Sequence, residues 1–297
     1  MVCDFFYIKL LQDSNIITIF ALQLKKTNLI MFTKSITAMR KEMGVSYLGG
    51  ITHSAKMNYS YRNGTNTYCV YLAPANMSGY EVCPNSKHCR AFCLNGAGHN
   101  KADILSKGIE NSSINKTRIK KTKCFFENKE LFMNLLIAEI KKEREIALFN
   151  GKAFSVRLNG TSDISPEDFI LNGKNILEIF PDVIFYDYTK DPRRISLMEK
   201  YPNYDITLSY NGYNGTACKN FLQRGGKVAV VFLNDLPKKF MGYDVIDGNG
   251  YDMRYLDKKQ SIIGLHYHRT ANDYVNGKFV EPQSKFIVKN NDPRCEW

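Results

Sequence analysis

AFSVRLNGTSD (residues 153–163) joins a short apolar strand directly to a polar loop that contains a glycine. The arrangement recurs where the strand at 183–187 runs into a polar turn and where the strand at 205–209 ends at Ser209. Residues 227–233 (KVAVVFL) are almost entirely apolar, which is typical of a strand covered on both faces. Strands of this kind, separated by helical segments, favour a parallel sheet with helices packed outside it.

The predicted elements define an α/β fold. Strands are expected at residues 67–72, 153–158, 183–187, 205–209, 227–233, 245–247 and 261–266. Helices are expected at residues 128–149, 166 to about 180, 194–201 and 216–224. These strands fit a partial (TIM-like) barrel with outer helices better than a closed eight-fold barrel, and in such folds the chemistry gathers at the carboxyl ends of the strands.

The chain is expected to hold one main domain. Residues 46–297 are predicted to form a single α/β barrel-like domain that carries a cysteine-rich loop. Residues 1–45 have a mixed apolar pattern without turn residues. They are predicted to be an N-terminal extension, either an added helical segment or sequence ahead of the true start. The apolar run at 14–24 is too short to cross a bilayer, so no membrane association is expected.

The charge and the cysteine content narrow the setting of the protein. Lys and Arg number 41 against 29 Asp and Glu, a formal net charge of +12, which favours a polyanionic partner such as nucleic acid or a phosphorylated substrate. Eight cysteines are too few for a disulfide scaffold of this length, so a reducing, cytoplasmic location is predicted. The sequence leaves the oligomeric state open.

Three of these cysteines, Cys83, Cys89 and Cys93, lie close together in one loop, and His99 follows shortly after. Thiolates bunched in this way can converge on a soft metal or an iron–sulfur cluster. Three cysteines leave one position open, which suits either a cluster with an exposed iron or a zinc site completed by His99. The basic surroundings favour the thiolate form.

Polar residues at the predicted strand ends are the other candidate site residues. A first group follows the strand at 153–158, namely Asn159, Gly160, Thr161, Ser162 and Asp163. Asp187 and Lys190 follow the next strand, and Ser209 follows the one after. Asp163 and Asp187 have the chemistry of a general base, a nucleophile or a cofactor contact, although Asp163 is also well placed to cap a following helix.

Several basic residues have two interpretations each. Arg157 binds an anion if it points into a barrel, and is ordinary surface if it points outward. Arg193 and Arg194, with Lys190, either grip a phosphate or form a solvated turn. The lysine-rich run at 101–123 either tracks a nucleic-acid backbone or is a solvated helix face.

The cysteine loop, with Phe92 directly before Cys93 and a strand just upstream, resembles the cluster loop of radical S-adenosylmethionine enzymes. The resemblance implies that three cysteines hold a 4Fe–4S cluster and that residues 159–163 contact the cofactor's amino group. Residues 185–192 and 205–209 are similar to strand ends in the branch containing DNA photoproduct lyases. Two features depart from the pattern: the first cysteine spacing is five residues where three is usual, and the glycine–glutamate–proline signature is absent.

A second resemblance covers most of the chain after residue 55. The segments that carry it are YLAPANMSGYEVCP, CRAFCLN, RLNGTSDI, FPDVIFYDYTK and VAVVF. Together they resemble a bacteriophage family called gene product 88. This resemblance implies a phage or prophage origin, and therefore a host cytoplasm as the location.

The favoured interpretation is an iron–sulfur enzyme that uses S-adenosylmethionine for radical chemistry on a nucleotide or on nucleic acid. Cys83, Cys89 and Cys93 would bind iron, residues 159–163 and Ser209 would hold the cofactor, and Asp163, Asp187 and Lys190 would serve catalysis. The first alternative is a deazaguanine transglycosylase-like enzyme that modifies DNA, with structural zinc on the cysteines and His99. The second is a zinc-stapled nucleic-acid-binding protein without enzymatic activity.

Overall fold

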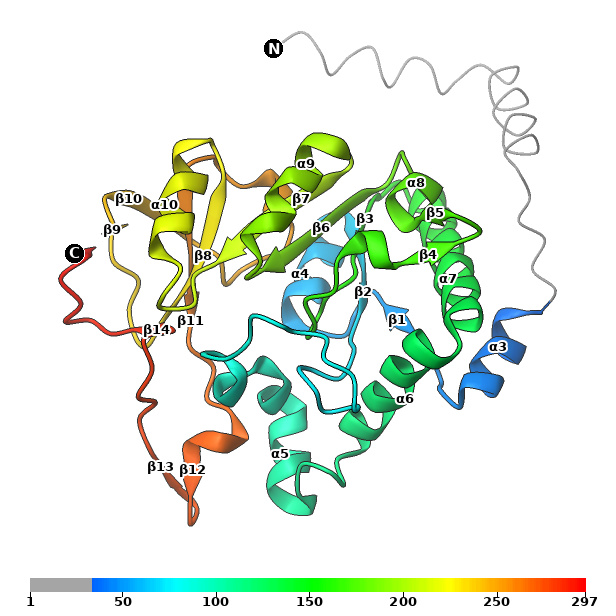
Figure 1. Cartoon of the computed structure of the whole chain (residues 1–297), viewed down its shortest axis with the longest axis horizontal. Helices are drawn as coiled ribbons and strands as arrows, with labels where there is room; N and C mark the ends of the chain where they lie inside the picture. Colours follow the sequence, from blue (N-terminus) through cyan, green and yellow to red (C-terminus); the bar gives the residue numbers. More distant parts are fainter. Residues whose placement is uncertain (1–33) are drawn as a thin grey trace, which may run out of the picture. The chain divides into compact units, whose positions relative to one another are not determined.

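A computed structural model describes residues 34–297, of which residues 36–297 form one compact unit. Its centre is a mixed sheet of eleven strands (Figure 1). In spatial order the strands are β1 (Gly49–Gly50), β2 (Thr65–Val70), β3 (Ala153–Arg157), β6 (Ile184–Thr189), β7 (Tyr204–Ser209), β8 (Lys227–Phe232), β11 (Ser261–His266), β10 (Tyr243–Asp247), β9 (Lys239–Phe240) and β15 (Cys295–Glu296), and β14 (Ile287–Val288) pairs with β8 beside this path.

The middle of the sheet is parallel, as predicted. The run from β2 to β10 pairs in parallel throughout, whereas β1, β9 and β15 pair antiparallel at the margins. All seven predicted strands are present with ends shifted by only a few residues. The strand order has two ends, so the described residues do not form a closed barrel.

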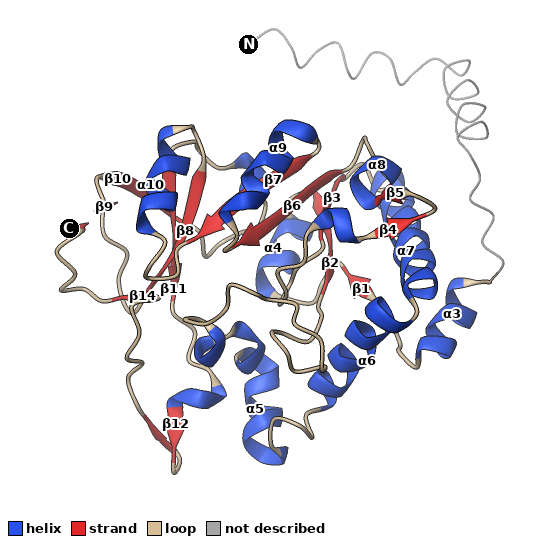
Figure 2. Ribbon diagram, in the orientation of Figure 1, coloured by secondary structure: helices blue, strands red, loops and turns tan. Residues whose placement is uncertain are grey.

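Three helices pack on one face of the sheet, toward which alternate side chains of the strands point. Val156, Phe185 and Ile206 are buried on this face. The covering helices are α7 (Lys129–Phe149) on β2 and β3, α9 (Ser196–Lys200) on β7, and α10 (Gly215–Gln223) on β7 and β8. Figure 2 shows these three helices in blue and the strands of the sheet in red.

The opposite face is polar and is covered differently. Tyr186 of β6 lies there, with its ring 5.5 Å from that of Tyr255 in the short helix η5 (Arg254–Leu256). Lys227 at the start of β8 donates to the backbone carbonyl of Arg254. The connection from β10 to β11 therefore runs across this face, and α4 (Ala55–Arg62) packs against β2 beside it.

The helix predicted from residue 166 to about 180 is wrong. The segment forms a short helix η3 (Pro166–Asp168), a hairpin of β4 (Ile170–Leu171) and β5 (Lys174–Asn175), and one turn of α8 (Ile176–Ile179). Asn172 and Gly173 both have positive φ, 51° and 76°. Asn-Gly with positive φ at both positions is the preferred turn of a two-residue hairpin, so this local signal overrode the helical spacing of the apolar residues.

The helix α3 (Ile36–Met43) packs against α7 and buries Met39 and Met43. This segment lies within the predicted extension 1–45, yet it belongs to the compact unit. Residues 1–33 of that predicted extension lie outside the described residues.

The remaining elements surround the carboxyl edge of the sheet. They are the short helices η1 (Arg90–Phe92), η2 (Leu94–Gly96), η4 (Pro192–Ile195) and η6 (Ala271–Asp273), the helices α5 (Gly98–Lys107) and α6 (Ser113–Glu127), and the hairpin β12 (Tyr274–Val275) and β13 (Lys278–Phe279). In the part of the chain that is described, every helix is too short or too polar to cross a membrane.

Candidate functional site

The cysteine loop lies against the carboxyl ends of β2 and β3. The Cys83 thiol lies 3.8 Å from the backbone carbonyl of Thr161, and the backbone N–H of Asp163 donates to the carbonyl of Val82 at 2.8 Å. At Gly160 a Cβ atom would come within 2.8 Å of the ring of Tyr71 and the carbonyl of Val70, so only glycine fits this approach. The structure therefore brings together two segments that were predicted separately from the sequence.

Lys190, one residue beyond β6, lies close enough to all three thiols to interact with them electrostatically. Burial acts to lower the pKa of its amine, but nearby acidic groups outweigh that effect and raise it. In order of influence these groups are Cys89, Asp163, Cys83 and Cys93. Cys83, Cys89, Cys93 and Lys190 thus form one cluster at the carboxyl edge of the sheet, which is named the thiol cluster below.

Burial is the main influence on the pKa of Cys83 and of Cys93. It raises the pKa of Cys83 to about 12, and it also raises the pKa of Cys93. Arg118 of α6 lies close enough to Cys93 to oppose that rise, and so does Lys190. Cys83 and Cys93 are therefore protonated at neutral pH, and a metal would have to displace their protons.

Asp163 and Asp187 converge on one buried guanidinium. Arg194, with 5% of its side chain exposed, donates from Nη1 to Asp163 Oδ1 at 2.5 Å and from Nη2 to Asp187 Oδ2 at 3.1 Å. Asp163 also accepts from the backbone N–H of Lys190 at 2.9 Å. Arg193 instead pairs with Asp191 at the surface. Both arginines that were predicted to bind phosphate therefore form ion pairs with carboxylates of the protein.

Asp187 lies on the helix-covered face of β6, because it alternates with Tyr186 and Tyr188. Its carboxylate is 1% exposed and accepts from Asn159 N–H at 3.1 Å, Asn159 Nδ2 at 2.8 Å and Tyr204 Oη at 3.3 Å, besides Arg194. Burial raises the pKa of Asp187, and Arg194 opposes that rise. This geometry makes Asp187 a positioning residue rather than a group that faces a substrate.

The other residues predicted to contact a cofactor shape the same edge. The amide of Asn159 donates to Asp187 and to the Ile164 carbonyl, and its Oδ1 accepts from the Ser162 hydroxyl at 2.8 Å. The hydroxyl of Thr161 donates to the Leu72 carbonyl at 2.5 Å. Ser209 is buried at the end of β7. These contacts fix the loop 159–163 beneath the cysteine loop.

A polar cluster on the other face of the sheet was not predicted as a unit. Arg157 does point inward, and its Nη1 donates to Asp252 Oδ2 at 2.7 Å, while the hydroxyls of Tyr186 and Tyr188 lie 3.4 Å from the same carboxylate. Burial acts to raise the pKa of Asp252, but Arg157 and then Lys56 outweigh it and lower the pKa. Arg157 therefore holds a carboxylate of the protein itself.

Four buried polar side chains brace the loop behind Cys93, and the sequence reasoning missed them. Asn115 Oδ1 accepts from Asn95 Nδ2 at 3.0 Å and from Asn100 Nδ2 at 2.9 Å, and Ser112 donates to Asn100 at 2.5 Å. The backbone N–H of Asn95 lies 3.5 Å from the Cys93 sulfur. Three asparagines in a segment whose helices are otherwise lysine-rich are the signal that could have pointed to this network.

Within residues 34–297, no group of three or more His, Cys, Asp and Glu side chains is arranged as a metal site. His99 is exposed in the first turn of α5. Whether the cysteines bind iron or zinc therefore stays a prediction, and so does the role of His99 as a zinc ligand.

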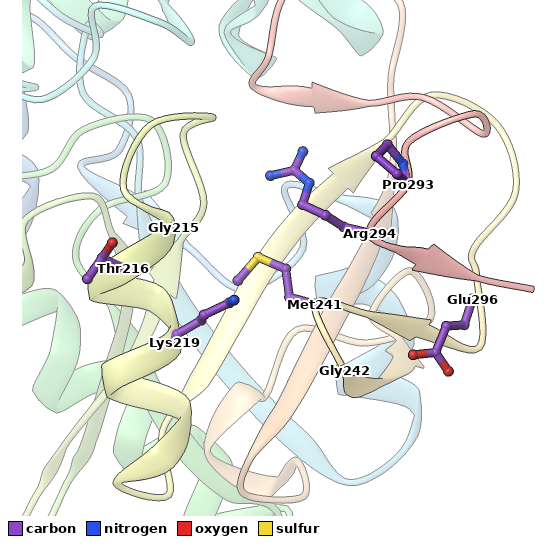
Figure 3. Close-up of a pocket in the computed structure, with 8 residues that line it drawn as sticks. All are labelled: Gly215, Thr216, Lys219, Met241, Gly242, Pro293, Arg294 and Glu296. Atoms are coloured by element: carbon purple, nitrogen blue, oxygen red, sulfur yellow. The ribbon is translucent and has the colours of Figure 1, made fainter.

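Two cavities lie at the surface, and the second borders the cysteine loop. One of about 490 Å³ is lined by Lys219 of α10, by Met241 and by Arg294, and Figure 3 shows the first and last of these reaching toward it. Another of about 570 Å³ lies on the outer side of Asp163 and Arg194. The first contains none of the residues that the sequence singled out as site residues.

Comparison with known proteins gives one match. The family model described as gene product 88 matches residues 26–283. No curated protein and no solved structure matches the chain.

Proposed function

We propose that this chain, which belongs to the gene product 88 family, is a partial-barrel iron–sulfur enzyme that uses S-adenosylmethionine for radical chemistry on a nucleotide or nucleic acid. One observation carries the proposal. Cys83, Cys89 and Cys93 all lie close to Lys190 at the carboxyl edge of a parallel sheet, where open α/β folds place their ligands.

The donor set fits a cluster by its chemistry. Three thiols supply three of the four sulfur ligands that a 4Fe–4S cluster takes, so one iron is left for another ligand. The thiols lie on a loop between β2 and α5 rather than on a strand, and Arg118 and Lys190 offer positive charge beside them. Because the pKa of Cys83 is about 12, loading with iron should release protons.

If Cys83, Cys89 and Cys93 held such a cluster, it would supply the electron that radical chemistry with S-adenosylmethionine requires. The chain's own residues do the remaining work. Lys190 places a positive charge beside any group that the thiols bind. Loop 159–163 lies directly beneath the thiols. The backbone N–H of Asp163 donates to the Val82 carbonyl, and its carboxylate accepts from the backbone N–H of Lys190. Asp187 orients the side chain of Asn159.

The transglycosylase alternative needs two strand-end carboxylates that face a substrate. Asp163 and Asp187 do approach each other, but both bind the guanidinium of Arg194, and Asp187 is 1% exposed. A carboxylate whose oxygens already accept hydrogen bonds from a buried arginine is not free to attack or protonate a substrate. The arrangement of these acids therefore supports the iron–sulfur proposal better than the transglycosylase alternative.

The proposal predicts cleavage of S-adenosylmethionine. The chain, loaded with iron and sulfide without oxygen and reduced with dithionite, should release 5′-deoxyadenosine. Cys89→Ala should abolish the product, because it removes one ligand. Cys124→Ala is the matched control, since this half-buried thiol lies on α6 and contacts the Asn128 carbonyl. Iron-loaded protein that yields no 5′-deoxyadenosine would contradict the proposal.

A further inference from the structure

Residues 267–273, which lead into a projecting hairpin, pack against the cysteine loop and α5. Asn272 Nδ2 donates to the Ala91 carbonyl at 2.8 Å, and the rings of Tyr267 and Phe92 lie 6.3 Å apart. The hairpin β12–β13 follows, with a tight turn at Asn276 and Gly277, whose φ angles are 49° and 75°. Figure 1 shows it extending from the body beside α5. It thus presents side chains next to the thiol cluster on a rigid support.

The side chains that the hairpin presents are aromatic and cationic. Tyr274 and Phe279 are cross-strand partners with ring centroids 6.2 Å apart. The guanidinium of Arg269 lies 4.0 Å from the ring centre of Phe279, and the amine of Lys101 lies 5.4 Å from that of Tyr274. Phe279 is 38% exposed, so one part of the ring remains open to solvent.

The cations of this surface are not engaged by the acids that lie nearby. Within the described residues, Lys101, Arg269 and Lys278 have no carboxylate within ion-pair distance. The neighbouring acids are occupied: Asp273 is buried and bonds Tyr267 and Thr270, Asp103 pairs with Lys107, and Glu281 pairs with Lys289. Three cations without a carboxylate partner, placed around two aromatic rings, suit a nucleic-acid strand that carries both phosphates and exposed bases.

We propose that this hairpin surface, made of Lys101, Arg269, Tyr274, Lys278 and Phe279, binds single-stranded nucleic acid and delivers it to the thiol cluster. A single strand is favoured over a duplex because exposed aromatic rings need unpaired base faces to stack on. The inference rests on the proposed function only for the choice of nucleic acid as substrate.

The test is binding of a fluorescein-labelled thymidine oligonucleotide of about 20 nucleotides to the full chain, followed by anisotropy across a salt series. Phe279→Ala should weaken binding about tenfold through lost stacking. Arg269→Gln combined with Lys278→Gln should make the slope of log affinity against log salt less steep by about 1.4, since each phosphate contact contributes about 0.7. Lys239→Gln, which alters an exposed lysine of β9, is the control and should leave both the affinity and the salt slope unchanged.

Three results would overturn the inference: hairpin variants that bind like the unaltered protein, a duplex that binds as tightly as the single strand, or Phe279→Ala changing self-association instead of oligonucleotide binding. The same preparations are assayed for 5′-deoxyadenosine. Product formation without oligonucleotide binding would overturn this inference alone. Hairpin-dependent binding without product would support the surface while contradicting the radical chemistry.

Discussion

Replacing Arg194 by methionine is expected to lower the free energy of unfolding by about 3–5 kcal/mol at pH 7, as removal of one partner from a buried ion pair typically does. The guanidinium is 5% exposed and is the cation that Asp163 and Asp187 share. Methionine fills much of the same volume but leaves two carboxylates without that charge. Chemical denaturation of both proteins would measure the difference.

The loss should depend on pH. Burial already raises the pKa of Asp187 above its usual value, and Arg194 restrains that rise. A carboxyl whose pKa is raised on folding binds more protons in the folded state, so its contribution to stability falls as pH rises through the folded pKa. Without Arg194 the pKa should rise further, and Arg194→Met should therefore be less destabilising at pH 5 than at pH 7.

Arg193→Met is the matched control for this substitution. Its side chain is 83% exposed and pairs with Asp191 at the surface, so the expected change is at most about 1 kcal/mol. Adding Asp187→Asn to Arg194→Met should recover part of the loss, because the amide carries no charge to leave unpaired. A loss equal to that of the control would show that Arg194 does not stabilise the two acids.

Glu139→Ala is expected to destabilise the protein by about 3–5 kcal/mol, since it leaves several buried donors without an acceptor. The carboxylate is 2% exposed and joins three separate parts of the chain. It accepts from Arg40 Nε at 2.8 Å, the backbone N–H groups of Leu48 and Gly49 at 3.1 and 3.0 Å, and Tyr68 Oη at 2.6 Å. Thermal unfolding, followed with a spectroscopic probe on α3, should show that this helix detaches at a lower temperature in the variant.

Glu145→Ala provides the comparison on the same helix. Glu145 is exposed on α7, and alanine suits a helix at least as well as glutamate, so the expected change is within about 0.5 kcal/mol. If both variants lose the same amount, the buried hydrogen bonds of Glu139 do not anchor the N-terminal segments.

Local sequence patterns predicted much of the fold. The apolar runs at β3, β7 and β8 are short, bounded by turn residues and too apolar for surface strands, which leaves little choice of structure. The error at 166–180 was avoidable, because Asn172-Gly173 is a stronger local signal than the spacing of a few apolar residues. Alternation along β6 also held the information that Asp187 and Tyr186 face opposite ways.

Other parts of the site depend on contacts that local patterns do not contain. Asp252 pairs with Arg157, which lies 95 positions away in the sequence. Arg118 lies near Cys93 but belongs to a separate helix. Arg194 was singled out for its charge, but its pairing with two strand-end acids depends on how β3 and β6 lie side by side. Such pairings follow from the sheet order rather than from spacing within one segment.

The iron content and the ultraviolet–visible spectrum of the full chain, purified without oxygen, test the central claim most directly. The account predicts about four irons per chain and a broad absorption near 400 nm that bleaches on reduction, both lost in Cys83→Ala and retained in Cys124→Ala. One zinc per chain with no visible absorption would contradict it, and the thiol cluster would then be a structural zinc site.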